Sequence, residues 1–280
     1  ISTLINHPKA LVQYFTVLHQ FISPKTLIHA PNVPPFYVPL LSYLGVDLFD
    51  LTFEYMRNIG NSFKTENALE YSSDEISSVS NSYFHVLKQV HNALYSGQLR
   101  DLVRIYSHSY PPLHAILRYI DNSLNLVENT PSIKSSALYC TDDTDLYRPE
   151  VLRFRERVKE RFVFPTHIEA VLFLPCSSKK PYSFSKSHNL FLNTIKRALR
   201  GKRHAIYQVI LTSPLGIVPR DLEWTYPAGH YDIPVTGEWS YAEKSMLKDA
   251  IYHLIKKMPS NVQLIAHLPN NELEILEAVV

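Results

Sequence analysis

Glycine is scarce in this 280-residue chain, which has seven glycines against 19 prolines. Neither G-x-G-x-x-G nor G-x-x-x-x-G-K-[ST] occurs, and these are the segments in which glycines let a backbone approach phosphates closely. The scarcity argues against a nucleotide-binding protein built on a glycine-rich phosphate loop.

Cysteine is equally scarce. Cys140 and Cys176 are the only two in the sequence, too few for a disulfide scaffold or a four-cysteine zinc ribbon. The 13 histidines are scattered, and no H-x-x-x-H or C-x-x-C pair occurs. We therefore expect no metal site.

Long hydrophobic runs are also missing. The longest, such as 170–174, fall far short of the ~20 residues that a membrane helix requires. No signal peptide is visible, so we expect a cytoplasmic protein without membrane contact. With 45% hydrophobic and 12% aromatic residues the chain can build a core, which excludes extended disorder.

The net charge of +2 conceals an uneven distribution. Eight basic residues and no acidic one lie between 179 and 203: Lys179, Lys180, Lys186, Lys196, Arg197, Arg200, Lys202 and Arg203. Such a stretch favours a nucleic acid, because neutralised phosphates release counterions. A second segment, 148–161, carries six basic and three acidic residues and fits a nucleic-acid contact or an ordinary solvated helix face equally well.

Hydrophobic periodicity predicts a partial, barrel-like β-α-β region at the N-terminus. Apolar residues at helical spacing predict helices over 8–21 and 38–44, whereas 26–29 and 46–51 resemble strands. Two strands are too few to close an α/β barrel. The polar segment 58–73 is expected to form a loop.

A helical block and then a parallel-sheet α/β core domain are expected next. The predicted helices of the block are 73–95, 99–106, 111–127 and 148–161. The core domain alternates strands and helices: 170–174, 189–200 (capped by Ser187), 205–211, 241–258, 262–267 and 271–280. This alternation predicts a parallel sheet. We accordingly divide the chain into regions 1–72, 73–164 and 165–280.

Two strand ends of the core domain open into unusual loops, and ligands of open parallel sheets bind at the carboxyl ends of strands. The first loop, 175–188, reads PCSSKKPYSFSKSH. The second, 213–239, holds both tryptophans and exceeds the ~15 residues beyond which a loop in a compact domain is usually functional. The site is expected at these two loops.

Side chains of the first loop admit two interpretations each. Nearby lysines and a helix N-terminus lower a thiol pKa, which favours a reactive thiolate at Cys176, whereas a lone cysteine is more often buried and structural. His188 either exchanges protons or caps the helix. Lys180 either binds a developing anion or phosphate or is an ordinary surface lysine.

Side chains of the second loop also have two interpretations each. Glu223 and Asp232 either hold a substrate amine and move protons, or make turn hydrogen bonds. Trp224 and Tyr231 either stack on a base or pack beneath the loop.

The first loop resembles a family motif. Its residues fill every specified position of P-C-S-x-x-K-P-Y-x-x-S-x-S-H, which is similar to the motif of archaeosine synthases. Residues 222–239 also resemble the core domain of that family. The resemblance implies catalytic roles for Cys176, Lys180, Ser185, Ser187 and His188. It implies substrate contacts for Pro175, Ser177, Tyr182, Glu223, Trp224, His230, Tyr231 and Asp232, and tRNA contacts for Lys179, Lys186, Lys196, Arg197, Arg200, Lys202 and Arg203.

The N-terminal half resembles archaeal tRNA-guanine transglycosylases at 45–50, 91–100 and 148–151. Asp50 matches the position of the transglycosylase nucleophile. Most of the barrel that would hold the base is absent from this sequence, and the zinc-binding cysteines of transglycosylases have no counterpart in it. We therefore expect a degenerate remnant without base exchange.

The archaeosine synthase resemblance implies a tRNA-modifying transferase that adds lysine to the nitrile of 7-cyano-7-deazaguanine in the D-loop of archaeal tRNA. Free lysine is the implied co-substrate, and no cofactor is expected in this chain. A radical SAM partner with an iron–sulfur cluster would cleave the lysine adduct, and a separate PUA-type protein would supply further RNA binding.

Two routes and one alternative function remain open. Cys176 either forms a thioimide with the nitrile that lysine then displaces, or is structural while lysine attacks directly. The alternative function is a non-catalytic tRNA-binding subunit of a tRNA modification complex.

Overall fold

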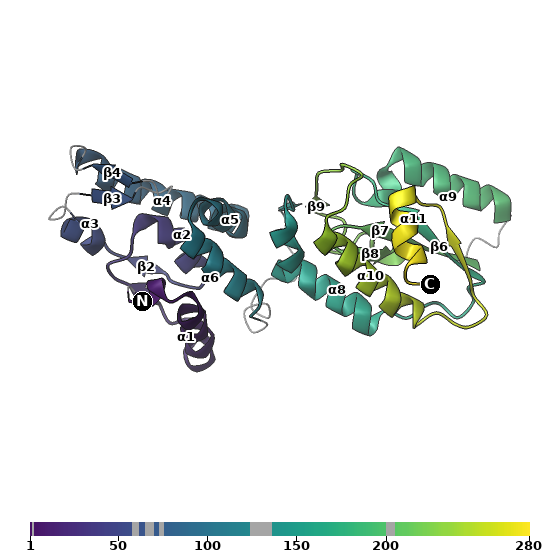
Figure 1. The fold of residues 1–280 in the computed structure, drawn as a ribbon, viewed down its shortest axis with the longest axis horizontal. Helices are drawn as coiled ribbons and strands as arrows, with labels where there is room; N and C mark the ends of the chain where they lie inside the picture. Colours follow the sequence, from purple (N-terminus) through teal and green to yellow (C-terminus); the bar gives the residue numbers. More distant parts are fainter. Residues whose placement is uncertain (2, 58–61, 65–69, 73–75, 124–135, 200–204) are drawn as a thin grey trace. The chain divides into compact units, whose positions relative to one another are not determined.

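The computed structural model describes residues 1, 3–57, 62–64, 70–72, 76–123, 136–199 and 205–280. The chain divides into two compact units, Ile1–Asn129 and Thr130–Val280 (Figure 1). Each unit has a hydrophobic core of its own, with no buried residue shared between the two.

The first unit is mainly helical, and its core includes Leu11, Phe15, Leu41 and Ile116. Its α-helices are α1 (Pro8–Phe21), α2 (Val38–Tyr43), α3 (Thr52–Arg57), α4 (Ile76–Ser96), α5 (Leu99–Ser109) and α6 (Pro111–Asp121). Prolines in the first turns of α1, α2 and α6 suit positions where no backbone N–H has an intrahelical partner. The helix predicted over 111–127 ends earlier, at Asp121.

The predicted β-α-β unit is present but short. β1 (His29–Ala30) pairs in parallel with β2 (Leu48–Phe49), and α2 connects them. The described residues form no closed barrel. The loop predicted over 58–73 is wrong in part, because β3 (Ser62–Lys64) and β4 (Glu70–Ser72) form an antiparallel pair. Three-residue strands are too short to show the alternation by which a strand is recognised.

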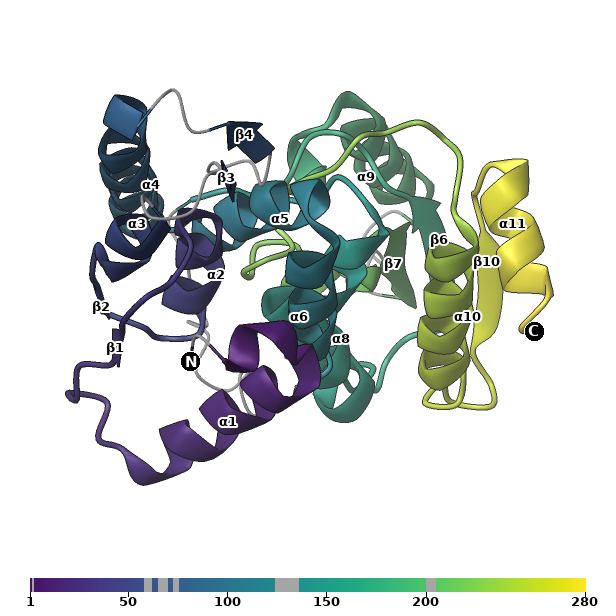
Figure 2. The same ribbon diagram turned by 60° about the vertical axis from the view of Figure 1, so that its left-hand side comes forward.

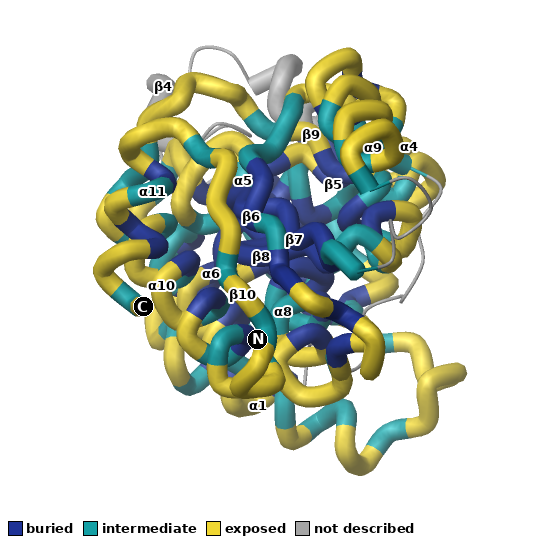
Figure 3. Tube along the Cα trace, turned by 90° about the vertical axis from the view of Figure 1, so that its right-hand side faces the viewer, coloured by how far each residue is buried: buried dark blue, intermediate teal, exposed yellow. Residues whose placement is uncertain are grey.

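The second unit is built on a four-stranded sheet in the order β10-β6-β7-β8. β6 (Ala170–Pro175), β7 (Ile206–Thr212) and β10 (Gln263–Ala266) are parallel, and β8 (Gly216–Pro219) pairs antiparallel with β7. The central strands are buried, whereas β10 is exposed over most of its length (Figure 3). The helices are α8 (Pro149–Arg161), α9 (Lys186–Leu199), α10 (Tyr241–Ile255) and α11 (Asn270–Glu277). α10 contacts β8, α8 and α11. Figure 2 shows α10 beside α11.

The sheet expected for this unit was all parallel, and the structure differs from that expectation in one strand, the antiparallel β8. The predicted loop 213–239 contains β8, and it also contains β9 (Tyr231–Asp232), which pairs in parallel with β5 (Leu138–Tyr139). Gly216 has φ +77°, so the turn into β8 uses a backbone conformation that favours glycine.

The boundary expected near residue 164 is also corrected. Val151, Phe154 and Val158 of α8 lie in the same core as β6 and β7, so this helix belongs to the second unit. Among the described residues, no helix has both the length and the apolar character needed to cross a membrane.

Candidate active site

The carboxyl ends of three parallel strands bring the candidate site together. Pro175 at the end of β6 is paired with Leu211 of β7, and Ala266 at the end of β10 is paired with Phe173 of β6. Cys176 follows β6 directly, Thr212 ends β7, and the first turn of α11 after β10 carries Glu272. Side chains from three distant segments of the sequence thus meet at one edge of the sheet.

Cys176 is half-buried and hydrogen-bonded to Thr212. Burial raises the pKa of the Cys176 thiol, and the negative charge of Glu272 raises it further, while Lys180 acts in the opposite direction. Desolvation of the thiolate thus outweighs the nearby cation in setting this pKa. A reaction at Cys176 needs a base to remove the thiol proton.

Glu272 can supply that base. It is 7% exposed, and burial raises the pKa of its carboxyl to about 7. Its Oε2 has no hydrogen-bond partner among the described residues. A carboxyl with this pKa exchanges protons readily near neutral pH. Glu272 was not predicted from the sequence, since a glutamate after a short strand carries no signal of its own.

Lys180 lies beside the thiol with its ammonium group uncommitted. Its Nζ is 4.3 Å from the centre of the Tyr231 ring and has no hydrogen-bond partner among the described residues. Burial lowers the pKa of Lys180, and the charges of Cys176 and Asp232 oppose that effect. Lys180 is half-buried, unlike an ordinary surface lysine.

Two buried tyrosines join the two loops beneath the thiol. The hydroxyls of Tyr182 and Tyr231 lie 2.5 Å apart, and Tyr231 also hydrogen-bonds Thr212. Burial raises the pKa of both phenols, so they stay protonated. Tyr231 therefore packs beneath its loop, where a base cannot stack on it.

His188 is fully buried and positions the loop. Its Nε2 donates to the Pro175 carbonyl at 3.0 Å, and its Nδ1 accepts from Arg220 at 2.8 Å. Burial and the Arg220 charge lower the pKa of His188 to about 4. Both ring nitrogens are thus committed to protein groups, and the imidazole is neutral at pH 7. These contacts suit a residue that positions the loop, where the sequence left proton exchange and helix capping open.

Arg220 organises the surroundings of His188. It donates to Gln208 at 2.9 and 3.1 Å and to Glu223 at 3.0 Å. Glu223 in turn accepts the backbone N–H of Ser183 at 2.8 Å. The Glu223 carboxylate is thereby held between the two loops. Arg220 and Gln208 were not predicted, because neither stands in a motif and their meeting depends on strand pairing.

The remaining predicted side chains lie at the helix start or on the surface. α9 begins at Lys186, and the N–H of His188 donates to Ser185 Oγ at 3.1 Å, so Ser185 caps the helix in place of the predicted Ser187. Ser187 is exposed and lies 3.2 Å from Ser185 Oγ. Ser177 donates to the Lys179 carbonyl at 3.0 Å. Asp232 and His230 are exposed.

Comparison with known proteins identifies the relatives. The family model described as "Domain of unknown function (DUF5591)" matches residues 151–280. The archaeosine synthase of Methanocaldococcus jannaschii is 36% identical over 274 residues, covering 95% of this chain and 46% of the relative. The archaeosine synthase subunit alpha of Thermococcus kodakarensis is 36% identical over 255 residues, covering 90% and 44%. The chain is a homologue of archaeosine synthases.

Two further matches complete the comparison. The tRNA-guanine(15) transglycosylase of Methanobrevibacter smithii is 28% identical over 177 residues, which cover 62% of this chain and 26% of the relative. A crystal structure of a protein of unknown function aligns with this chain at 26% identity and a TM-score of 0.32. The alignment covers 45% of this chain and 38% of the chain in that crystal structure. This archaeosine synthase homologue spans about half the length of the archaeosine synthases that it matches.

An exposed aromatic and basic surface borders the site in this archaeosine synthase homologue. Trp224, 55% exposed, meets Phe184 edge to face at 4.9 Å, and Lys179 Nζ lies 6.0 Å from the Phe184 ring. The lysines and arginine predicted on α9 are exposed: Lys186, Lys196 and Arg197. Arg200, Lys202 and Arg203 lie outside the described residues. No group of three potential metal ligands occurs in the part of the chain that the structure describes.

Proposed function

We propose that this chain acts in archaeosine biosynthesis, where it adds lysine to the nitrile of 7-cyano-7-deazaguanine in the D-loop of tRNA. The observation that carries the proposal is the grouping of Cys176, Lys180 and Glu272 at one edge of the sheet. Support comes from relatives named archaeosine synthase, one of which aligns with 95% of this chain.

The grouping supplies each step of an addition through Cys176. The Glu272 carboxylate removes the thiol proton, and the thiolate attacks the nitrile carbon. A C–S bond forms, one carbon–nitrogen π bond breaks, and the Lys180 ammonium protonates the nitrogen. The result is a thioimide. Because burial lowers the pKa of Lys180, its ammonium gives up this proton more readily than an ordinary lysine.

The second step consumes the lysine co-substrate. Its neutral ε-amine attacks the thioimide carbon, a C–N bond forms, and the C–S bond breaks. The attacking nitrogen passes one proton to the neutral Lys180 amine, and the departing sulfur takes back the proton held by Glu272. The product is an amidine that joins lysine to the base, with Lys180 and Glu272 restored. The atoms of nitrile and amine are all retained in the product, so no oxidant, reductant or cofactor is needed in this chain.

Partner proteins complete the proposed pathway. Relatives named archaeosine synthase subunit alpha support an assembly of more than one protein. A radical SAM partner with an iron–sulfur cluster would cleave the lysine adduct, and a PUA-type protein would add RNA binding. The aromatic and basic surface around Trp224 and Lys179 is where we propose that tRNA reaches the site.

The test is transfer of labelled lysine to tRNA that carries the nitrile base. Wild-type protein is expected to add one lysine per tRNA, measured by intact mass, and Cys176→Ala to reduce the rate at least about a hundredfold. Cys140→Ala, the matched control, should retain transfer. Near-normal transfer by Cys176→Ala would contradict the thioimide and favour direct attack by lysine.

A second candidate function is a non-catalytic tRNA-binding subunit. The observation that favours it is the raised pKa of Cys176, since a thiol that holds its proton is a poor nucleophile. Salt-sensitive tRNA binding by a wild-type protein that transfers no lysine would favour this candidate over the enzyme.

A further inference from the structure

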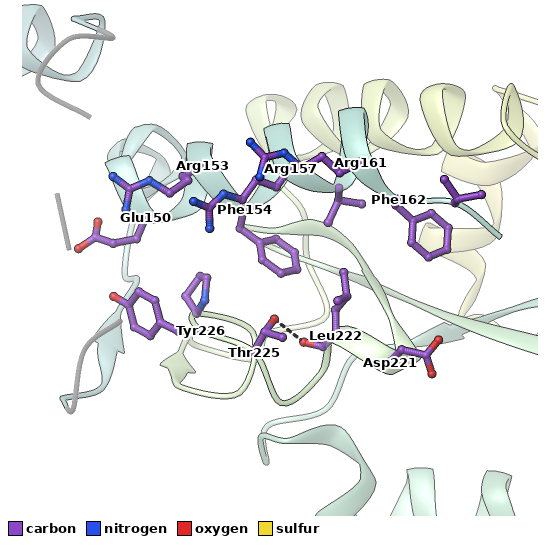
Figure 4. A pocket seen from close by; sticks show the side chains of 13 residues that line it. Glu150, Arg153, Phe154, Arg157, Arg161, Phe162, Asp221, Leu222, Thr225 and Tyr226 are labelled. Carbon is purple, nitrogen blue, oxygen red and sulfur yellow. Dashed lines mark hydrogen bonds between the residues drawn. The ribbon is translucent and has the colours of Figure 1, made fainter. Parts of the chain in front are cut away.

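A cavity of about 540 Å³ lies in the second unit between α8 and residues 221–227 (Figure 4). None of the side chains described around Cys176 lines it. The volume falls within the roughly 300–1,000 Å³ typical of small-molecule sites.

One wall of the cavity is positively charged. Arg153, Arg157 and Arg161 recur every four residues along α8 and therefore share one face of the helix (Figure 4). Arg157 and Arg161 are exposed, and neither makes an ion pair or hydrogen bond with the described residues.

The other faces of α8 differ from this one. Arg155 donates to the Leu146 carbonyl at 2.9 Å, and Lys159 pairs with Asp249 at 3.5 Å. Arg155 and Lys159 thus have partners within the protein, whereas Arg157 and Arg161 line the cavity without a partner among the described residues. A merely solvated helix face, one of the two interpretations of this segment, gives no reason for a cavity beneath these arginines.

The interior of the cavity, between α8 and residues 221–227, is apolar and aromatic. Phe154, 6% exposed, faces Leu222 and Tyr226 across the cavity in Figure 4. Glu150 and Asp221 also line it, and both have partners within the protein: Glu150 lies 3.8 Å from Arg148, and Asp221 accepts from the Tyr207 hydroxyl at 3.1 Å. Flat apolar walls next to free guanidinium groups are the two features with which proteins hold an unstacked base and its phosphate.

We infer that this cavity binds one unstacked nucleotide of an RNA strand. The base packs between Phe154 and Tyr226, and the flanking phosphate is bound by Arg157 and Arg161. The choice of RNA rests on the function proposed above. The structural argument rests on the charge, the aromatic walls and the volume of the cavity.

The first experiment measures binding of the full chain to a fluorescent tRNA transcript by anisotropy, from 50 to 200 mM salt. The transcript lacks the nitrile base, so binding is measured without lysine transfer. Arg157→Ala with Arg161→Ala is expected to weaken binding about tenfold and to lower the salt slope by about 1–2. The matched control, Lys244→Ala with Lys248→Ala, removes two positive charges from exposed positions of α10 that do not line the cavity, and it should change binding by less than about threefold.

A second variant separates the cavity from the charges. Thr225→Trp fills the cavity from an exposed position and leaves every charge in place. It is expected to weaken tRNA binding about as much as loss of the arginines. Circular dichroism and urea unfolding check that each variant folds.

Two outcomes would overturn the inference. Unchanged binding in Thr225→Trp would show that phosphates touch α8 without a base in the cavity. Unchanged binding in all variants, with an altered oligomeric state, would show that a polypeptide segment occupies the cavity. If lysine transfer fails while both cavity variants weaken tRNA binding, the proposed function is wrong and this inference stands.

Discussion

Glu272 and His188 carry opposite pKa shifts, and burial is the main cause of both. Glu272 has a pKa of about 7 instead of 4.5, so the folded protein keeps a proton that the unfolded chain releases between these values. The free energy of unfolding therefore falls as pH rises through this window. His188 has a pKa of about 4 instead of 6.5, so the unfolded chain binds a proton first, and stability falls as pH drops through that window. The two effects oppose each other between about pH 4.5 and 6.5.

Glu272→Gln should reveal the histidine effect. Without the buried carboxylate, the free energy of unfolding is expected to rise steadily from pH 4 to 6.5 and to exceed that of the wild type by about 1–3 kcal/mol at pH 8. Urea unfolding at a series of pH values measures both. A variant that follows the wild type at every pH would mean that Glu272 is not desolvated in solution.

Alkylation of Cys176 by iodoacetamide tests the charges around the thiol. In a Cys140→Ala background, Glu272→Gln removes a negative charge that raises the thiol pKa and should accelerate the reaction about threefold to tenfold at pH 7.5. Lys180→Met removes the opposing positive charge and should slow the reaction by a similar factor. Equal rates in both variants would contradict the electrostatic coupling of these three residues.

At the scale of helices and strands, a buried ion pair joins α5 to α6. Arg100 Nη2 donates to both carboxylate oxygens of Asp121 at 2.8 and 2.9 Å, and the two side chains are 3% and 6% exposed. Asp121→Ala leaves the arginine charge buried and should lower the free energy of unfolding of the first unit by about 3–5 kcal/mol. Arg100→Met with Asp121→Leu removes both charges and should recover most of that loss in urea unfolding. A double variant as unstable as the single one would show that packing, not charge, sets the cost.

Elements with a local pattern were predictable from the sequence. The periodicity of α1 gave both of its ends, and β6 and β7 were found within one or two residues. β8 was not found, because its short apolar run lies in a proline-rich segment and is stabilised by pairing with β7. Strand pairing of this kind is non-local and leaves no periodic trace in the sequence.

The residues of the candidate site also fall into two groups, those in a local sequence motif and those that only the folded sheet brings together. Cys176, Lys180, Tyr182 and Tyr231 stand in recognisable motifs and were predicted. Thr212, Glu272 and the pair of Arg220 with Gln208 come from strand ends that only the sheet brings together. The sequence left the state of Cys176 open for a related reason: sequence neighbours reveal the nearby cations but not the burial that outweighs them.

At the scale of the whole chain, two separate cores predict two units that unfold separately. Every buried residue of the second core lies between Leu138 and Leu276. The sheet, α8, α10 and α11 all contribute side chains to this core. The matched family region, 151–280, begins inside α8, and the structure extends this unit toward the N-terminus to include β5, which pairs with β9.

The fragment Thr130–Val280 is therefore expected to fold without the first unit. It should show a near-ultraviolet dichroism spectrum typical of packed aromatic side chains and a single cooperative urea transition. A fragment that begins at 151, as the family region does, loses β5 and the buried Arg148, and it should be less stable by several kcal/mol. Comparison of the two urea midpoints measures this difference. Strong dye binding and a non-cooperative transition in Thr130–Val280 would show that its core needs the first unit, because an incompletely packed core exposes apolar surface.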